Sequence, residues 1–105
     1  MAKVTIITKD NIEETIKVGT VVIQFSASWC GPCRQLTPIM EQLSTDFNNK
    51  AVFGKVDIDN DQELATKYGI RSVPTTIIFK DGKVVDTITG VEAATTLTSK
   101  IDGFL

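Results

Sequence analysis

The spacing of hydrophobic and polar residues changes repeatedly along this chain of 105 residues. Short segments rich in β-branched and aromatic side chains predict five strands, at residues 4–8, 21–26, 52–58, 75–79 and 83–88. Apolar residues three or four positions apart predict four helices, at residues 10–18, from the cysteines to 47, at 62–68 and between 91 and 105. Helices and strands therefore alternate along most of the chain, and two strands follow one another near its end.

The predicted helix after the cysteines has the clearest amphipathic pattern. Its apolar stripe falls at offsets 0, 3, 4, 7 and 11 and consists of Leu36, Ile39, Met40, Leu43 and Phe47. Pro38 lies inside this stretch and has no N–H group to donate to the carbonyl of Arg34. We therefore expect a long helix that is kinked near Pro38.

The order of the predicted elements decides the fold class. Strands that alternate with helices favour parallel pairing, whereas the Asp81-Gly82 turn between the last two strands favours an antiparallel hairpin. No low-complexity linker or internal repeat divides the chain. The sequence predicts a single α/β domain over residues 1–105, in which a central mixed sheet of five strands is flanked by four helices.

Composition and charge narrow the class of function. Apolar residues make up 42% and charged residues 23% of the chain, which is the balance of an ordinary globular protein. A formal net charge of −2 and the lack of a basic run argue against nucleic acid or an anionic membrane as a partner. The first five residues do not resemble a signal peptide, and the apolar runs are too short to span a membrane. We therefore expect a cytoplasmic protein, in a compartment where disulfides are catalytic or transient.

The absence of histidine removes several kinds of chemistry. Serine and cysteine nucleophiles that depend on a histidine base are excluded, as are most zinc enzymes. The two cysteines cannot complete a four-ligand zinc or iron–sulfur site without carboxylates or a partner chain. We therefore expect no metal site in this chain.

Cys30 and Cys33 carry the candidate chemistry. They lie three residues apart at a predicted strand-to-helix junction, and one helical turn brings two cysteines within the Cα separation of about 4.4–6.8 Å that a disulfide needs. Such a pair is typical of a dithiol that cycles between its reduced and oxidised forms. Backbone N–H groups at the start of the helix stabilise a thiolate, so we expect Cys30 to attack a substrate disulfide. We expect Cys33, one turn further on, to be more enclosed and to resolve the mixed disulfide.

Two other interpretations of the cysteine pair remain open. A purely structural disulfide would close a loop of only four residues, worth roughly 2 kcal/mol in the chain-entropy model, which is little for a domain with an adequate core. A half metal site shared between two chains is the second alternative. Neither explains the position of the pair at a helix start as well as a redox role does.

Residues 29–33, Trp-Cys-Gly-Pro-Cys, match the active-site motif of the thioredoxin family residue for residue. The resemblance covers essentially all 105 residues and extends to Phe25, Ala27, Pro38, Asp57, Asp59, residues 68–75, residues 79–82 and Gly90. Because both the motif and the order of the matching segments agree, the chain is identified as a member of this family. The resemblance implies the thioredoxin fold over residues 1–105.

The resemblance also implies a docking surface and partners. It implies that Pro74 is cis and packs opposite the cysteines, which leaves the backbone of Val73 free to pair with an extended substrate segment. The residues alone would instead favour a simple proline at a strand start. The apolar docking face implied by the family consists of Trp29, Gly31, Pro32, Val73, Pro74 and Gly90. The expected partners are a thioredoxin reductase, which holds the NADPH and FAD, and oxidised protein substrates, with this chain a monomer that carries no cofactor.

Two positions depart from the family pattern. Ser26 replaces a common tryptophan, and Gln24 stands where the family usually buries an aspartate that accepts the proton of the resolving cysteine. Glutamine cannot take that proton, and Lys55, which matches the usual partner of the aspartate, loses its partner. The proton of Cys33 would then pass to water or to another group such as Asp57, which shares a strand face with Lys55. The alternative is that Gln24 is an ordinary buried polar residue satisfied within the sheet or through a water.

The function implied by these residues is that of a protein-disulfide reductase. The Gly-Pro pair between the cysteines carries no charge that would further stabilise the thiolate, so the dithiol should favour reduction of its partners. A dithiol oxidase or isomerase is the first alternative, and a measured reduction potential would separate the two. The second alternative is a binding subunit that uses its surface and not its sulfurs.

Overall fold

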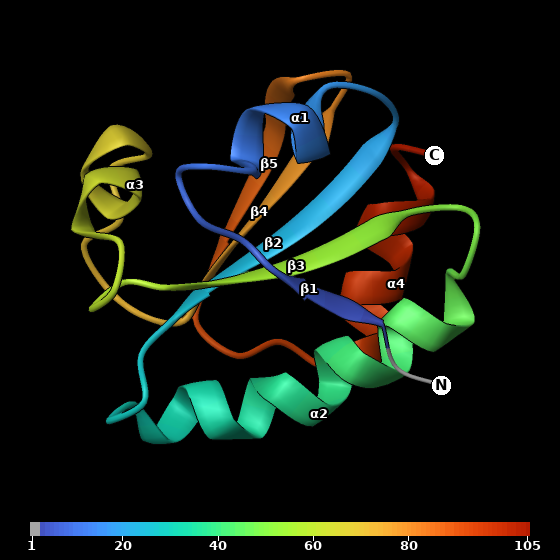
Figure 1. Cartoon of the computed structure of the whole chain (residues 1–105). Coiled ribbons are helices and arrows are strands. Elements are labelled where there is room, and N and C mark those ends of the chain that lie inside the picture. Colours follow the sequence, from blue (N-terminus) through green and yellow to red (C-terminus); the bar gives the residue numbers. More distant parts are fainter. Residues whose placement is uncertain (1–2) are drawn as a thin grey trace.

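The computed structural model describes residues 3–105, which fold into five strands and four helices around a single sheet (Figure 1). In chain order the elements are β1 (Val4–Ile6), α1 (Ile12–Ile16), β2 (Thr20–Ser26), α2 (Gly31–Asp46), β3 (Val52–Asp57), α3 (Gln62–Lys67), β4 (Thr75–Lys80), β5 (Lys83–Thr89) and α4 (Ala94–Asp102). The predicted α/β class and the mixed five-stranded sheet are confirmed. Residues 1–2, which the predicted domain and the signal-peptide expectation include, lie outside the described part of the chain.

The strand order in the sheet is β1-β3-β2-β4-β5, which places β2 at the centre. β3 pairs in parallel with both β1 and β2, whereas β4 runs antiparallel to β2 and to β5. All seven residues of β2 are buried, as expected for a strand covered on both faces. The carboxyl end of β2 therefore delivers the chain from the middle of the domain to the two cysteines.

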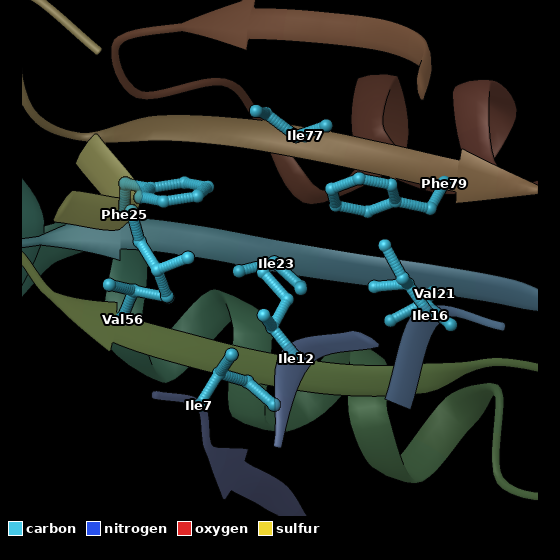
Figure 2. Packing of buried hydrophobic residues seen from close by; sticks show 10 residues of the cluster. Ile7, Ile12, Ile16, Val21, Ile23, Phe25, Val56, Ile77 and Phe79 are labelled. Atoms are coloured by element: carbon cyan, nitrogen blue, oxygen red, sulfur yellow. The ribbon is translucent and has the colours of Figure 1, made fainter. Parts of the chain in front are cut away.

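Helices cover both faces of the sheet, α1 and α3 on one side and α2 and α4 on the other (Figure 1). On the α1 side the strands contribute alternate apolar residues, and Figure 2 shows Phe25, Ile23 and Val21 of β2 packed among side chains of neighbouring elements. On the α2 side Val22 belongs to a second buried cluster, which includes Leu97 of α4. This alternation along β2 is the period of two that a strand imposes.

Helix α2 has the pattern that the sequence predicts. The stripe residues Leu36, Met40, Leu43 and Phe47 are buried, and Ile39 packs partly buried against the same cluster. Pro38 lies inside the helix, and the ribbon of α2 changes direction partway along its length (Figure 1). The redox motif thus lies at the start of a long helix that packs against the sheet.

Two helices are shorter than predicted. Helix α1 spans Ile12–Ile16 and not residues 10–18. Its start is later than predicted because the side chain of Asn11 accepts a hydrogen bond from the N–H of Thr8 at 2.8 Å and donates one to the carbonyl of Ile6 at 2.9 Å. These bonds hold residues 7–11 in a turn, which also ends β1 at Ile6. At the other end of the chain α4 spans Ala94–Asp102, and the apolar stripe overestimates its length because its outer members, Val91 and Leu105, are exposed.

The predicted hairpin between β4 and β5 is present. Asp81 and Gly82 have φ values of 49° and 87°, and two consecutive positive φ angles are what a two-residue type I′ turn requires. The turn is tied to the start of β2, since Asp81 accepts a hydrogen bond from the N–H of Gly19 at 2.8 Å and donates its own N–H to the Gly19 carbonyl at 3.0 Å. The hairpin therefore completes the sheet on the side opposite β1.

Candidate active site

Cys30 is the N-cap residue of α2. Its backbone is extended, and its Sγ accepts a hydrogen bond of 3.1 Å from the N–H of Cys33. Pro32 occupies the first turn, where its missing N–H costs no helical hydrogen bond. The N–H of Cys33 and the positive end of the α2 dipole both favour negative charge on this sulfur. The site thus meets the electrostatic requirement for a thiolate nucleophile.

Cys30 and Cys33 are joined by a disulfide, with a Cα–Cα distance of 5.3 Å. Both residues are almost fully buried, at 4% and 2% exposed, so Cys33 is only slightly more enclosed than Cys30 and the expected contrast is small. Their surroundings differ more than their exposure does. The Sγ of Cys30 lies 3.6 Å from the carbonyl oxygen of Val73, whereas Cys33 lines a cavity that is open to solvent and includes the exposed residues Ser28 and Arg34.

The segment opposite Cys30 contains a cis peptide bond between Val73 and Pro74. The N–H of Gly90 donates to the carbonyl of Pro74 at 2.8 Å, which ties the start of β4 to the end of β5. Trp29, Gly31 and Pro32 are exposed and Val73 and Gly90 are half-buried, but Pro74 is buried. Pro74 therefore supports the surface from beneath, while the other five residues remain accessible around Cys30.

Two charged residues that the sequence analysis did not single out for the site lie against it. The indole Nε1 of Trp29 donates to a carboxylate oxygen of Asp59 at 2.9 Å, and the guanidinium of Arg34 donates to the carbonyl of Ser28 at 3.0 Å. The Asp57-x-Asp59 pattern at the end of β3 was the available signal for the contact between Trp29 and Asp59. For the second, the signal was the position of Arg34 directly after Cys33. Both contacts fix the loop that carries Trp29.

The two positions that depart from the family lie on one face of the sheet, beneath α2. Gln24 lies opposite Lys55 in the β2–β3 pair, and Ser26 lies opposite Asp57. Gln24 is 2% exposed, and its Nε2 has no hydrogen-bond partner within residues 3–105. Lys55 donates to Thr37 Oγ1 at 3.4 Å. The amide nitrogen of Gln24 therefore has no partner among the described protein groups, and the side chain lines a cavity that can hold water.

Cys33 and Gln24 line two different, adjacent cavities. Cys33 lines a cavity of about 160 Å³ together with Arg34, Lys55 and Asp57, whereas Gln24 lines another of about 200 Å³. Lys55 and Thr37 line both. The structure thus brings Asp57, and not Gln24, into the same cavity as the resolving cysteine.

Within residues 3–105 no group of three or more histidine, cysteine, aspartate or glutamate side chains is placed to hold a metal ion. No helix in this part of the chain is long and apolar enough to cross a membrane. The cysteine pair is therefore the centre around which the candidate chemistry is built.

Comparison with known proteins agrees with this geometry. The sequence profile of the family described as Thioredoxin matches residues 3–103. The chain belongs to the thioredoxin family. It is 37% identical to a thioredoxin of Staphylococcus haemolyticus over 94% of this chain and 95% of that protein. It is 46% identical to a thioredoxin of Chlorobaculum thiosulfatiphilum over 78% of this chain and 76% of that protein.

Solved thioredoxin structures have the same fold. A mutant thioredoxin from Halobacterium salinarum superposes with a TM-score of 0.91 at 31% identity, over 97% of this chain and 90% of that one. A thioredoxin of Malassezia sympodialis gives 0.88 at 35% identity, over 99% and 92%. The chain is a thiol–disulfide oxidoreductase whose redox-active pair is Cys30 and Cys33. Thioredoxins use this disulfide and no further redox cofactor.

Proposed function

We propose that this chain is a protein-disulfide reductase that carries electrons from a thioredoxin reductase to oxidised proteins. The Cys30 thiolate attacks a substrate disulfide, and one substrate sulfur leaves as a thiolate. Cys33 then attacks Cys30, the internal disulfide forms, and the second substrate sulfur is released. The observation that carries the proposal is the hydrogen bond from the Cys33 N–H to Cys30 Sγ at the start of α2, beside the accessible surface of Trp29.

Substrates dock as extended segments on the surface around Cys30. Val73 lies two residues before β4, and its backbone pairs with the incoming segment. Trp29, Gly31, Pro32 and Gly90 supply the accessible surface for side chains of the substrate. Pro74 is buried and supports this surface from within the protein. Substrate contact therefore depends on backbone pairing more than on one deep pocket.

We also propose that the protein acts as a monomer in the cytoplasm. Helices cover both faces of the sheet and bury a hydrophobic cluster on each, so neither face needs a second chain. A catalytic, transient disulfide is typical of a reducing compartment. NADPH and FAD belong to the partner reductase, which re-forms the dithiol after each cycle.

A reduction assay tests the proposed function. Reduction of insulin by this protein, NADPH and a thioredoxin reductase should be fast for the wild type and absent for Cys30→Ser. Cys33→Ser should still attack but remain as a mixed disulfide, visible as a covalent adduct that dithiothreitol releases. Wild-type reduction by Cys30→Ser would overturn the proposal.

The two alternative functions predict different results. An oxidase or isomerase would show a reduction potential well above that of reducing thioredoxins, measured against a glutathione buffer. A binding subunit would keep its cellular role in a variant with both cysteines changed to serine. The enclosed thiolate site at the helix start favours the reductase, because a binding surface alone does not require it.

A further inference from the structure

We propose that Asp57 accepts the proton of Cys33 in place of the acid that is absent at position 24. This inference rests on the proposed function, because it concerns the step in which Cys33 resolves the mixed disulfide. Cys33 and Asp57 line the same cavity of about 160 Å³, which exceeds the roughly 30 Å³ that one water molecule occupies in the liquid. A water in this cavity can connect the thiol to the carboxylate.

In the resolving step the sulfur of Cys33 attacks Cys30 Sγ. The Cys30–Cys33 bond forms, and the bond between Cys30 and the substrate sulfur breaks. Two electrons pass from the dithiol to the substrate disulfide, and the substrate sulfur leaves as a thiolate. The proton of Cys33 moves through the cavity water to a carboxylate oxygen of Asp57 and from there to solvent.

The carboxylate of Asp57 is oriented but not occupied by a counter-ion. Its Oδ1 accepts the N–H of Asp59 at 2.9 Å, and its Oδ2 accepts a longer bond of 3.3 Å from the side chain of Asn60. Each oxygen has capacity for another hydrogen bond. The only ion pair within 4.0 Å among residues 3–105 joins Lys100 and Asp86, so Asp57 is not locked in one. It is half-buried and can exchange a proton with solvent.

The charged groups around this cavity come from two elements. Helix α2 contributes Cys33 and Arg34, and strand β3 contributes Lys55 beside Asp57. Asp59 follows in the next loop, but its side chain bonds to the indole of Trp29. The two cations favour a thiolate at Cys33 once its proton has left. The cavity therefore combines a proton acceptor with positive charge that stabilises the product of deprotonation.

Position 24 is excluded from this cavity. The hydrogen-bonded pair Lys55 and Thr37 lines both cavities and lies between Gln24 on one side and Cys33 on the other. An amide cannot accept the proton in any case. The second cavity holds a different carboxylate, that of Glu41, which serves as a matched control.

The test compares the two half-reactions. In Asp57→Asn the resolution rate near neutral pH should fall by about 10²-fold, the lower end of the usual contribution of a general base. Asp57→Glu should recover most of the rate, and Glu41→Gln should behave as the wild type. Attack by Cys30, measured in the Cys33→Ser background as formation of the mixed disulfide, should change little with Asp57→Asn.

The outcomes separate the two proposals. Asn at position 57 retains an acceptor oxygen for the Asp59 N–H, and an unchanged melting temperature would show that the fold is intact. Should Asp57→Asn unfold, the comparison of Asp57→Ser with Asp57→Glu still tests the assignment, since only the second keeps a carboxylate and should resolve the mixed disulfide faster. A wild-type resolution rate in Asp57→Asn would overturn the role of Asp57 while the inactivity of Cys30→Ser upheld the reductase.

Discussion

Gln24 on β2 and Thr76 on β4 lie directly opposite each other in the antiparallel pair, and each buries a polar atom without a partner in the described chain. Their exposed fractions are 2% and 1%. An unpaired buried donor or acceptor costs about 1–3 kcal/mol. The centre of the sheet beneath α2 therefore holds two buried polar atoms that no described protein group pairs.

Thr76→Val should stabilise the protein by about 1 kcal/mol, because valine has nearly the same shape and removes the unpaired hydroxyl. Thr75→Val is the matched control: its hydroxyl donates to the carbonyl of Ser72 at 2.8 Å, and its loss should cost about 1 kcal/mol. Urea unfolding gives both free energies. Destabilisation by Thr76→Val as large as that of Thr75→Val would contradict the expected difference.

Gln24→Asp should raise the pKa of the Cys30 thiol relative to the wild type. A buried negative charge near the site disfavours the thiolate, so the neutral amide of this chain leaves the Cys30 pKa lower than an acid at the same place would. Ultraviolet thiolate absorbance of the reduced proteins, followed through a pH titration, gives the two values. Gln24→Leu, which adds no charge, should stay close to the wild type, and a lower Cys30 pKa in Gln24→Asp would refute the argument.

Much of the fold followed from local patterns. The stripe from Leu36 to Phe47 and the Asp81-Gly82 turn each specify their element without help from distant residues, and both are present. The start of α1 was not predictable in this way. It depends on the side chain of Asn11 bonding back to Ile6, which holds the preceding residues in a turn and not in the helix.

The same distinction, between features set by local sequence and features set by distant contacts, applies to the candidate site. The N-cap position of Cys30 follows from a strand, a Cys-Gly-Pro-Cys motif and a helix in that order. The burial of Pro74 and the separation of Gln24 from Cys33 do not, because they depend on how β4 packs and on where Lys55 and Thr37 meet. Contacts between elements distant in sequence decide which polar residue shares a cavity with the resolving sulfur.

Gly54→Ala should destabilise the protein by about 1–3 kcal/mol, the usual cost of overpacking a core. A Cβ at position 54 would lie 2.5 Å from Cγ1 and 3.0 Å from Cδ1 of Ile7, which is 1% exposed and has little room to move. Gly103→Ala is the control, since its backbone is helical and its nearest neighbour would be the Lys100 carbonyl at 3.4 Å. Equal unfolding free energies for the two variants would show that the side chain of Ile7 moves to make room for the added methyl group.

Trp29 should report the redox state of the neighbouring cysteines. It is the single tryptophan of the chain and directly precedes Cys30, so a change in the bonding of that sulfur alters the surroundings of the indole. Reduction should therefore change its emission in the wild type and leave it unchanged when both cysteines are serine. Asp59→Asn weakens the bond that holds the indole, so its fluorescence anisotropy should fall, whereas Asp86→Asn, which breaks an ion pair formed with Lys100, should leave it unaltered. Because Trp29 is 65% exposed, the loss of stability in Asp59→Asn should remain below about 1 kcal/mol. Emission that is the same before and after reduction would mean that the indole does not lie against the sulfurs, and the docking surface would have to be redrawn without it.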